Sequence, residues 1–374
     1  MTPHAIEKIL LQDPDTPIVT SILDRYRPVL DSLDSVYVFG AGRTGSNVAR
    51  HLAKGGIRVI GFIDNSPAHE NVDGIPVNPL DAIADKNATI VIGTGYQYPI
   101  ARQLTAAGFH RHVSYHALSL RGGILPRDIS FQDIEDLPGL TQELIALYEM
   151  LGDRESKETL KAVLRYRTSL DPSHLHRVAR DKASQYFDRD VVSTSDGDSV
   201  FVDGGGYDGD STAAFFRFSR GSYKHVYYFE PDTRLCDAAR RSLRLPERTT
   251  FLNLGLWSQQ TTRYFQETGG MDGFMSDGQT AGSVAVPCST LDREIEEPIT
   301  FIKLDIEGAE TAAIQGSARH IRQDRPVIAC AWDHSSGDLV AVPRAIRSLG
   351  CGYTMRIRHY GDTVSETVAY FTQD

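Results

Sequence analysis

Glycines and acids lie close together in the segment Val200–Thr212, which reads VFVDGGGYDGDST. Four glycines fall within six positions: Gly204, Gly205, Gly206 and Gly209. Without side chains they let a ligand approach the backbone, and the helix expected after them offers free N–H groups. Asp203 precedes them, where a carboxylate would repel a pyrophosphate but attract a positively charged ligand. S-adenosylmethionine, with its sulfonium and amino group, is such a ligand.

Two further segments carry groups that could hold the rest of a nucleoside. The next predicted strand, HVYYFEPD, ends in Glu230, whose carboxylate can accept both ribose hydroxyls, and Asp232 follows it. A dinucleotide-binding fold uses a strand-end acid in the same way, so Glu230 fits both kinds of cofactor. The turn in TFLNLGLWS puts Gly255, Leu256 and Trp257 where an adenine ring could lie against them. Packing in the core accounts equally well for Trp257.

Acids and histidines gather at the ends of two later predicted strands. ITFIKLDIEGAE delivers Lys303 and Asp305, and RPVIACAWDHSSGDL ends its strand with Asp333 and His334. Ligands of open α/β sheets bind at the carboxyl ends of such strands. His334 and, further on, His359 are candidate general bases. Lys303 is a further candidate catalytic residue, although we expect it to pair with an acid rather than to act as a base. Oxygen ligands from Asp305 and Asp333 beside the His334 imidazole would also suit a divalent metal such as Mg2+.

The elements that must position these residues follow an alternating pattern. Apolar strand segments alternate with helix-period segments before residue 125 and again after residue 190, which predicts mainly parallel sheets. The stretch between them is charged and helix-periodic, with an interruption at Pro172. We therefore expect an α/β protein with two Rossmann-like domains, at residues 1–125 and 191–374, joined by a helical connector at residues 126–190.

A second glycine turn, GAGRTG, lies in the first predicted domain. Gly40, Gly42 and Gly45 satisfy the same GxGxxG pattern, which is a weak signal by itself, and no acid precedes them. Asp64 ends the following strand at a spacing that fits a ribose-binding acid. The phrase GFIDNSPAHENVDGIPV resembles the N-terminal nucleotide-sugar-binding domains of some sugar acyltransferases, over residues 35–116. Three interpretations stay open: a nucleotide-sugar or substrate-carrier site, a structural or oligomerising domain without ligand, and an NAD(P) site.

The second half of the chain, residues 185–371, resembles a known family. The segments YFDRD, VFVDGGGYDGDST, YYFEPD, STLDREI, FIKLDIEGAE and IRHYGDTVSETVAYF are similar to those of the FkbM-type methyltransferases. That family is S-adenosylmethionine-dependent and mostly O-methylating, and it acts on sugars and natural products. The resemblance implies a seven-stranded methyltransferase sheet ending in an antiparallel hairpin. On the cofactor motifs it places Asp203, Gly205, Tyr207, Gly209 and Glu230.

The same resemblance places Asp305 near the transferred methyl group. Many relatives carry Glu shortly before the His at the end of the fifth strand, where this chain has Asp333. Asp305, Asp333 and His334 together are similar to the magnesium site of catechol O-methyltransferase. Methyl transfer is an in-line displacement that gains from a dry, oriented site, and an alcohol acceptor needs a base or a metal.

Two functions from different classes compete on this evidence. The favoured prediction is an S-adenosylmethionine-dependent O-methyltransferase acting on a hydroxyl of a sugar, glycoconjugate or natural product. The alternative is an NAD-dependent oxidoreductase that uses the upstream glycine loop. Asp203 before the glycines and the KLDIEGAE strand favour the first.

Composition narrows the classes of partner. The net charge of -10 and the lack of a Lys/Arg run argue against a nucleic-acid binder, because phosphate neutralisation needs a basic face. The four cysteines are too widely spread for a disulfide framework, so we expect buried, reduced thiols and a cytoplasmic protein. No apolar run approaches the ~20 residues that span a bilayer. We expect a small-molecule or sugar acceptor and no membrane or nucleic-acid partner, and a homo-oligomer stays open.

Overall fold

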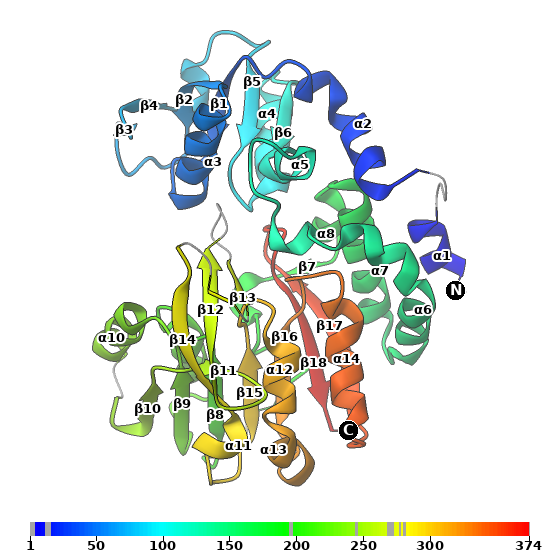
Figure 1. Cartoon of the computed structure of the whole chain (residues 1–374), viewed down its shortest axis with the longest axis vertical. Coiled ribbons are helices and arrows are strands. Elements are labelled where there is room, and N and C mark those ends of the chain that lie inside the picture. The colour runs from blue at the N-terminus through cyan, green and yellow to red at the C-terminus, as the bar shows by residue number, and fades with distance from the viewer. Residues whose placement is uncertain are drawn as a thin grey trace.

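The computed structural model describes residues 4–11, 16–193, 197–243, 246–267, 273–276, 278–279 and 282–373. Two α/β domains lie one above the other, and helices from the middle of the chain lie beside the lower domain and reach the junction with the upper one (Figure 1). Each domain is built on a mainly parallel sheet whose central strands are apolar and buried, because helices cover both faces. The prediction of two Rossmann-like α/β domains is confirmed.

The N-terminal sheet has the strand order β3-β4-β2-β1-β5-β6. Its strands are β1 (Ser35–Phe39), β2 (Arg58–Ile63), β3 (Asn71–Val72), β4 (Ile75–Asn78), β5 (Thr89–Ile92) and β6 (His112–Ser114). The helices are α2 (Ile18–Leu30), α3 (Arg43–Lys54), α4 (Gln97–Ala106) and α5 (Tyr115–Arg121), with the 3-10 turn η1 (Leu80–Ala82). Because β2 and β5 flank β1, the glycine turn after β1 sits where the strand order reverses.

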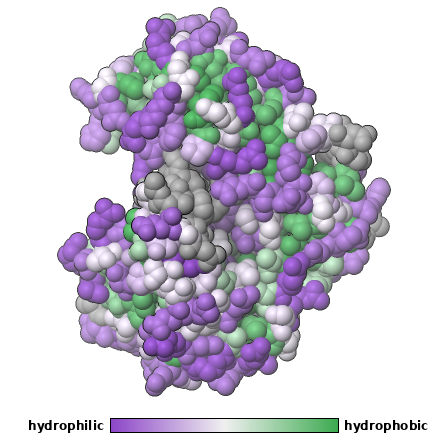
Figure 2. Space-filling view, viewed as in Figure 1, coloured by the Kyte–Doolittle hydropathy of each residue, from purple (hydrophilic) through white to green (hydrophobic). Residues whose placement is uncertain are grey.

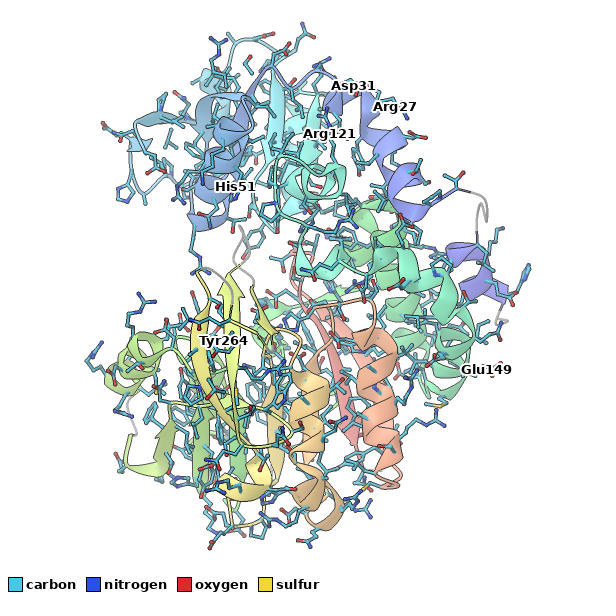
Figure 3. The ribbon with its side chains drawn as sticks, in the orientation of Figure 1. Arg27, Asp31, His51, Arg121, Glu149 and Tyr264 are labelled. Carbon is cyan, nitrogen blue, oxygen red and sulfur yellow. The ribbon has the colours of Figure 1, made fainter. Side chains whose placement is uncertain are left out.

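Helix α2 is fixed to this domain at its C-terminal end. Arg121 of α5 donates from Nη1 to the Leu30 carbonyl oxygen at 2.6 Å, which satisfies one of the free carbonyls of the last turn of α2. Figure 3 shows Arg27, Asp31 and Arg121 together at this corner of the molecule.

The connector forms the side of the molecule that touches both domains. It contains η2 (Ile129–Phe131), η3 (Ile134–Leu140), α6 (Thr141–Met150), α7 (Arg154–Ser169), α8 (Ser173–His176) and η4 (Lys182–Ser184). Helix α1 (His4–Leu10) packs against α6 and α7. Helix α7 begins after Asp153, whose carboxylate accepts the Ser156 N–H at 2.8 Å, and ends at Leu170 in the left-handed conformation.

The C-terminal sheet has the order β10-β9-β8-β15-β16-β18-β17-β7. Its strands are β7 (Ala179–Arg180), β8 (Val200–Gly204), β9 (His225–Phe229), β10 (Thr249–Leu252), β15 (Phe301–Leu304), β16 (Val327–Ala331), β17 (Thr354–Tyr360) and β18 (Thr367–Thr372). The helices are α9 (Asp210–Phe218), α10 (Thr233–Ser242), α11 (Leu291–Glu294), α12 (Glu310–Gln315), α13 (Ala318–Gln323) and α14 (Asp338–Ser348), with η5 (Pro246–Arg248). β17 and β18 form the predicted antiparallel hairpin.

Two features of this domain differ from the prediction. The sheet has eight strands instead of seven, because β7 of the connector pairs in parallel with β17. Between Gly255 and Ser289 the chain forms a second, four-stranded sheet where we expected strands alternating with helices. Its strands are β11 (Gly255–Leu256), β12 (Thr261–Glu267), β13 (Gly273–Ser276) and β14 (Val284–Ser289), in the order β11-β14-β12-β13. β-Branched residues in β12 and β14 favour strands over helices.

An aromatic cluster fills one face of the C-terminal sheet. It contains Phe187 of the connector together with Phe201, Phe215, Phe218 and Phe301, with ring centroids 4.4–5.9 Å apart. Phe187 is 5% exposed. The segment that leads from η4 into β8 is therefore anchored in the core of the domain.

The fold shields all four cysteine thiols from solvent. Cys236, Cys288, Cys330 and Cys351 are all buried and free, as the sequence predicts. Burial raises the pKa of the Cys288 thiol to about 11 and that of Cys330 well above its usual value. Within the described ranges, no helix is both long enough and apolar enough to cross a bilayer.

Candidate functional site

The residues predicted to do chemistry meet at the carboxyl edge of the C-terminal sheet. β8 pairs with β9 on one side and with β15 on the other, so the strand order reverses between β8 and β15. Asp203 and Lys303 are partners in this register, and Asp305 lies two residues beyond Lys303. The crevice outside such a reversal is where open α/β sheets bind ligands. On one side of the molecule a recess separates the two domains (Figure 2), with His51 of α3 and Tyr264 of β12 on its two sides (Figure 3).

Asp203 is buried inside this edge and does not face the crevice. It is 0% exposed. Its Oδ2 accepts the hydroxyls of Ser211 at 2.7 Å and Thr212 at 2.6 Å, and its Oδ1 lies 3.2 Å from Lys303 Nζ. From the sequence we expect this carboxylate to meet the positive charge of a ligand. Instead it ties the glycine loop, the start of α9 and β15 together.

Lys303 is the cation at the centre of the edge. Its Nζ donates to the Gly205 carbonyl oxygen at 2.7 Å and lies 4.0 Å from Asp305 Oδ2. Burial alone would lower its pKa, but Asp203 and Asp305 outweigh burial and raise the pKa above the usual value. Lys303 therefore stays charged and pairs with acids, as the sequence predicts, and it is not a proton acceptor.

The glycine loop brings the ends of β8 and β15 together. Gly205 has φ +74°, and a Cβ on it would lie 1.9 Å from the Asp305 carbonyl oxygen. A Cβ on Gly206 would lie 2.0 Å from the Tyr228 ring. Tyr207 follows with φ +52° and is 48% exposed, so its side chain projects from the loop. Only glycine lets the loop close against Asp305 in this way.

Glu230 closes the glycine loop from the end of β9. Its Oε2 accepts the Tyr207 N–H at 3.0 Å, and its Oε1 accepts the Asp232 N–H at 2.8 Å. Burial raises its pKa above the usual value. Each carboxylate oxygen keeps a further lone pair, so ribose hydroxyls could still bond to it. Asp232 has a different role, because its Oδ1 accepts the Arg234 N–H at 2.8 Å and caps α10.

The segment predicted to cover an adenine ring is mostly packed into the domain. Gly255 and Leu256 form β11, and Leu256 is 2% exposed. A Cβ on Gly204 would lie 2.9 Å from Leu256 Cδ1, so the Leu256 side chain packs directly against the end of β8. The Trp257 ring has the Arg263 guanidinium carbon 4.2 Å from its centroid. One face of this ring is therefore covered by the protein itself.

Asp305 is the partly exposed carboxylate of the edge. Its side chain is 38% exposed, whereas those of Asp203 and Lys303 are 0% and 2% exposed. Oδ2 accepts the Tyr186 hydroxyl at 2.9 Å, and Oδ1 lies 3.5 Å from His334 Nε2. Burial alone would raise its pKa, but Lys303 and His334 hold the pKa below the usual range. Asp305 is therefore an ionised, oriented carboxylate at neutral pH.

His334 lies among carboxylates, which changes its predicted role. Its Nδ1 is 3.1 Å from Glu310 Oε1, and its Nε2 is 3.6 Å from Glu307 Oε2. Burial alone would lower its pKa, but Glu310 and Glu307 raise the pKa well above the usual value. The imidazole is therefore held as a cation at neutral pH and has no free lone pair with which to act as a base. We correct the prediction of a general base at this position.

His359 is also unsuited to the predicted role of base. It is 0% exposed, and its Nε2 lies 3.1 Å from the Thr363 carbonyl oxygen, to which it must donate. Its Nδ1 then accepts the Thr367 hydroxyl at 3.0 Å. Burial lowers its pKa to about 4. Both ring nitrogens are bonded inside the hairpin, so His359 is a structural residue.

The residues predicted to bind a metal do not form a site of that kind. No group of three His, Cys, Asp or Glu side chains is arranged to hold a metal ion in the part of the chain that the structure describes. Asp333 Oδ2 accepts the Thr367 N–H at 3.1 Å, which ties this carboxylate to the start of β18. His334 is already engaged with three acids.

The connector supplies two site-supporting residues that the sequence did not identify. Tyr186 bonds to Asp305, as described above, from the YFDRD segment that precedes β8. Arg167 of α7 is 3% exposed and donates from Nη2 to the Asp333 carbonyl oxygen at 2.7 Å and from Nη1 to Ser336 Oγ at 3.2 Å. Tyr186 lies 119 residues before Asp305 and Arg167 lies 166 residues before Asp333, so no spacing rule relates these pairs and only the fold reveals their contacts.

The upstream glycine loop is closed by its own acid. Asp64 Oδ2 accepts the Ala41 N–H at 2.8 Å, and Oδ1 accepts the Ser66 N–H at 2.8 Å. A Cβ on Gly45 would lie 1.8 Å from the Gly40 carbonyl oxygen, so Gly45 serves the close packing of α3 on β1. Nothing lies within 4 Å of a Cβ on Gly42. Asp64 thus bonds to the upstream loop as Glu230 bonds to the downstream loop, and each of its oxygens likewise keeps a lone pair that a ribose hydroxyl could use.

Comparison with known proteins finds a family-model match in the C-terminal half of the chain. Residues 203–355 match the family model of the methyltransferase FkbM domain. The crystal structure of methyltransferase FkbM from Methylobacillus flagellatus KT superposes with a TM-score of 0.74 and 22% identity, over 99% of this chain and 100% of that one. At this identity the likeness bears on the fold, which includes both domains. No protein among the curated sequences matches the chain.

Two other solved structures overlap with parts of the chain. Aeropyrum pernix fibrillarin, with natively bound S-adenosyl-L-methionine, has a TM-score of 0.32 and 12% identity over 48% of this chain and 67% of its own. A SAM-dependent methyltransferase from Aquifex aeolicus has a TM-score of 0.31 and 10% identity over 54% of this chain and 97% of its own. Similarity at this level adds nothing to the assignment.

Proposed function

We propose that the chain is an S-adenosylmethionine-dependent methyltransferase that methylates an oxygen atom, on a hydroxyl of a sugar, glycoconjugate or natural product. The match of residues 203–355 to the methyltransferase FkbM domain supports this proposal. The observation that carries the proposal is the state of Asp305. It is an ionised carboxylate with 38% of its side chain exposed, at the edge where β8 and β15 separate. A carboxylate held there favours a positively charged donor over a nicotinamide cofactor with its two phosphates.

The chain's own residues define how the donor would be held. Glu230 would accept the ribose hydroxyls, and the glycine loop would let the donor lie against the backbone of residues 204–206. Asp305 would face the sulfonium. Its attraction to the sulfonium is lost once the methyl group has left, because the product thioether is neutral.

The proton of the acceptor hydroxyl needs a final acceptor. His334 is cationic and His359 is buried, so we take the partly exposed carboxylates Asp305 and Glu307 as the candidate acceptors at this edge. A carboxylate is a weak base toward an alcohol, but the oxygen becomes strongly acidic as the new C–O bond forms. Late proton transfer to a carboxylate therefore suits this site, and no step here relies on a metal.

Isothermal titration tests the donor. S-adenosylmethionine and NAD are titrated separately into the wild type, Glu230→Ala and the control Glu296→Ala, which removes an exposed acid of the same domain. We expect the wild type and the control to bind S-adenosylmethionine, about tenfold weaker binding in Glu230→Ala, and no NAD signal. If NAD still binds to Glu230→Ala and the methyl donor does not bind, the result would indicate an NAD-dependent function at the upstream glycine loop.

A transfer assay then tests the methylated atom. Methyl-labelled donor is incubated with a panel of sugars, glycosides and natural-product alcohols, and the labelled product is analysed by 13C NMR, in which O-methyl and N-methyl carbons differ. Parallel reactions with Mg2+ and with EDTA measure any metal requirement. Labelled methoxy groups are the expected product, and label found only on nitrogen would reject O-methylation.

A further inference from the structure

Tyr186 lies outside the matched methyltransferase domain, yet it makes a direct contact with the site. Its side chain is directed at the end of β15, where the hydroxyl donates to Asp305 Oδ2 at 2.9 Å. The residue is 6% exposed, and Lys303 Nζ lies 5.4 Å from the centroid of its ring. Tyr186 thus stands between the connector and Asp305, a partly exposed carboxylate of this edge.

The backbone of Tyr186 is held in an unfavourable conformation. Its φ is +63°, in the left-handed region that residues with a side chain seldom adopt. Strong contacts on its C-terminal side keep it there. Phe187 is buried in the aromatic cluster, and Asp188 Oδ2 accepts Arg180 Nη1 at 2.6 Å and the Tyr360 hydroxyl at 2.9 Å. The left-handed backbone directs the Tyr186 side chain to the sheet edge while its neighbours enter the core. The strained conformation of Tyr186 is therefore the one that places its hydroxyl beside Asp305.

The placement matters because Asp305 lies between two cations. Lys303 Nζ is 4.0 Å from Oδ2, and His334 Nε2 is 3.5 Å from Oδ1. Neither separation is a close hydrogen bond, so the carboxylate could approach either cation if nothing held it. The Tyr186 hydroxyl is neutral and bonds to Oδ2, the oxygen nearer Lys303. It orients the carboxylate without cancelling its charge.

We propose that Tyr186 is a positioning residue that keeps Asp305 off Lys303, and that it thereby sets the preference of the site for the positively charged donor over the neutral product, S-adenosylhomocysteine. This inference rests on the proposed donor. A carboxylate that turned onto Lys303 would present less charge to the sulfonium. The neutral product would be affected much less, because it has no charge at that atom. The phenol stays protonated at neutral pH, since burial and Asp305 raise its pKa well above the usual value.

The test compares two ligands and needs no acceptor. Dissociation constants for S-adenosylmethionine and S-adenosylhomocysteine are measured by isothermal titration on the wild type and on Tyr186→Phe, which removes one oxygen atom and keeps the ring. Tyr223→Phe is the matched control, because Tyr223 is 3% exposed and its hydroxyl has no partner among the described residues. We expect Tyr186→Phe to bind the donor about fivefold more weakly and the product within about twofold of the wild type. The control should leave both constants unchanged.

A double-mutant cycle separates positioning from a general structural effect. Asp305→Asn removes the charge on which Tyr186 is inferred to act, so adding Tyr186→Phe to it should not change the ratio of the two constants further. The inference is overturned if Tyr186→Phe keeps the wild-type ratio, weakens both ligands equally, or has the same effect on the ratio in the Asp305→Asn background. Failure of the wild type to bind the donor at all would instead reject the proposed function, and this inference with it.

Discussion

The two glycine-rich turns share a sequence pattern but use their glycines differently. Gly205 has φ +74° and leaves no room for a Cβ beside the Asp305 carbonyl oxygen. Gly42 has φ -78° and open space around the position of a Cβ. A GxGxxG match therefore does not tell which glycines the fold requires, because the requirement comes from what the backbone lies against.

Alanine substitutions should separate these two cases. We expect Gly205→Ala to lower the free energy of unfolding by more than about 3 kcal/mol, because it combines a strained φ with a backbone clash. Gly42→Ala should change it by less than about 0.5 kcal/mol. Urea denaturation measures both. An unchanged Gly205→Ala protein would mean that the loop does not close against β15 as described.

His359 should make the protein sensitive to acid. Its pKa is about 4 when folded and about 6.5 in an unfolded chain, so the unfolded chain takes up the proton first as the pH falls. The stability linked to His359 is thus fully present above pH ~6.5 and is lost between pH ~6.5 and ~4, by about 3 kcal/mol in total. His359→Gln cannot titrate but keeps a donor for the Thr363 carbonyl. Its urea midpoint should fall less steeply over this range, and an identical slope would contradict the assignment.

The sequence located the chemically important residues better than it assigned their roles. Glu230 and Asp305 could be placed because a strand followed by a glycine turn puts its last residues at the sheet edge. The charge on His334 could not, since it depends on Glu307 and Glu310, which read as the start of a helix. The burial of Asp203 could not be predicted either. An acid before glycines gives the same sequence pattern whether its side chain points into the protein or toward the crevice.

At the scale of elements, α7 fixes the turn between β16 and α14. Arg167 bonds to the carbonyl oxygens of Ser130 and Asp333 and to Ser336 Oγ, while Asp133 accepts the N–H groups of Ser336 at 2.9 Å and Gly337 at 2.7 Å. His334 lies within this turn. The orientation of the imidazole toward Asp305 therefore depends on a helix that precedes the matched domain.

Removing the Arg167 guanidinium should loosen that turn. We expect Arg167→Met to lower the free energy of unfolding by about 2–4 kcal/mol, because it leaves buried carbonyl oxygens without donors. Hydrogen exchange of the amides of Ser336 and Gly337 should become faster. Arg165→Met, two residues earlier on the exposed side of α7, is the control and should alter neither quantity. Equal effects of the two substitutions would argue against the specific contact.

Two elements could not have been predicted from local patterns. β7 has two residues, and it exists because the Gly361 N–H donates to the Arg180 carbonyl oxygen at 2.8 Å and Arg180 is held by acids. The small sheet from β11 to β14 forms through pairings between strands that are separated by turns. Both depend on partners distant in sequence, whereas the longer parallel strands are evident from their own apolar residues.

At the scale of the molecule, the connector joins the two domains through buried polar groups. Tyr166, the neighbour of Arg167 on α7, has its hydroxyl 2.9 Å from Nδ1 of His116 in α5, which is 2% exposed. Gln97 at the start of α4 contacts the same ring nitrogen at 2.9 Å. Adjacent residues of one helix therefore contact the N-terminal domain and the carboxyl edge of the C-terminal sheet.

This junction predicts linked unfolding of the two domains. Both tryptophans, Trp257 and Trp332, belong to the C-terminal domain, so their fluorescence reports on that domain, while far-UV circular dichroism reports on the whole chain. Tyr166→Phe should cost about 1 kcal/mol and move both urea transitions together. Two separate transitions, with the fluorescence midpoint unmoved by the substitution, would show that the domains unfold independently.

Because all four native thiols are buried, a fluorescent label can be attached selectively to the glycine loop to follow its motion. A maleimide dye reacts with exposed thiolates, and the native cysteines are both shielded and, for Cys288 and Cys330, hard to ionise. Tyr207, at the tip of the loop, is 48% exposed. Tyr207→Cys would thus supply the single reactive handle on an otherwise native chain, and a fluorophore attached there could follow ligand entry in real time without any cysteine being removed.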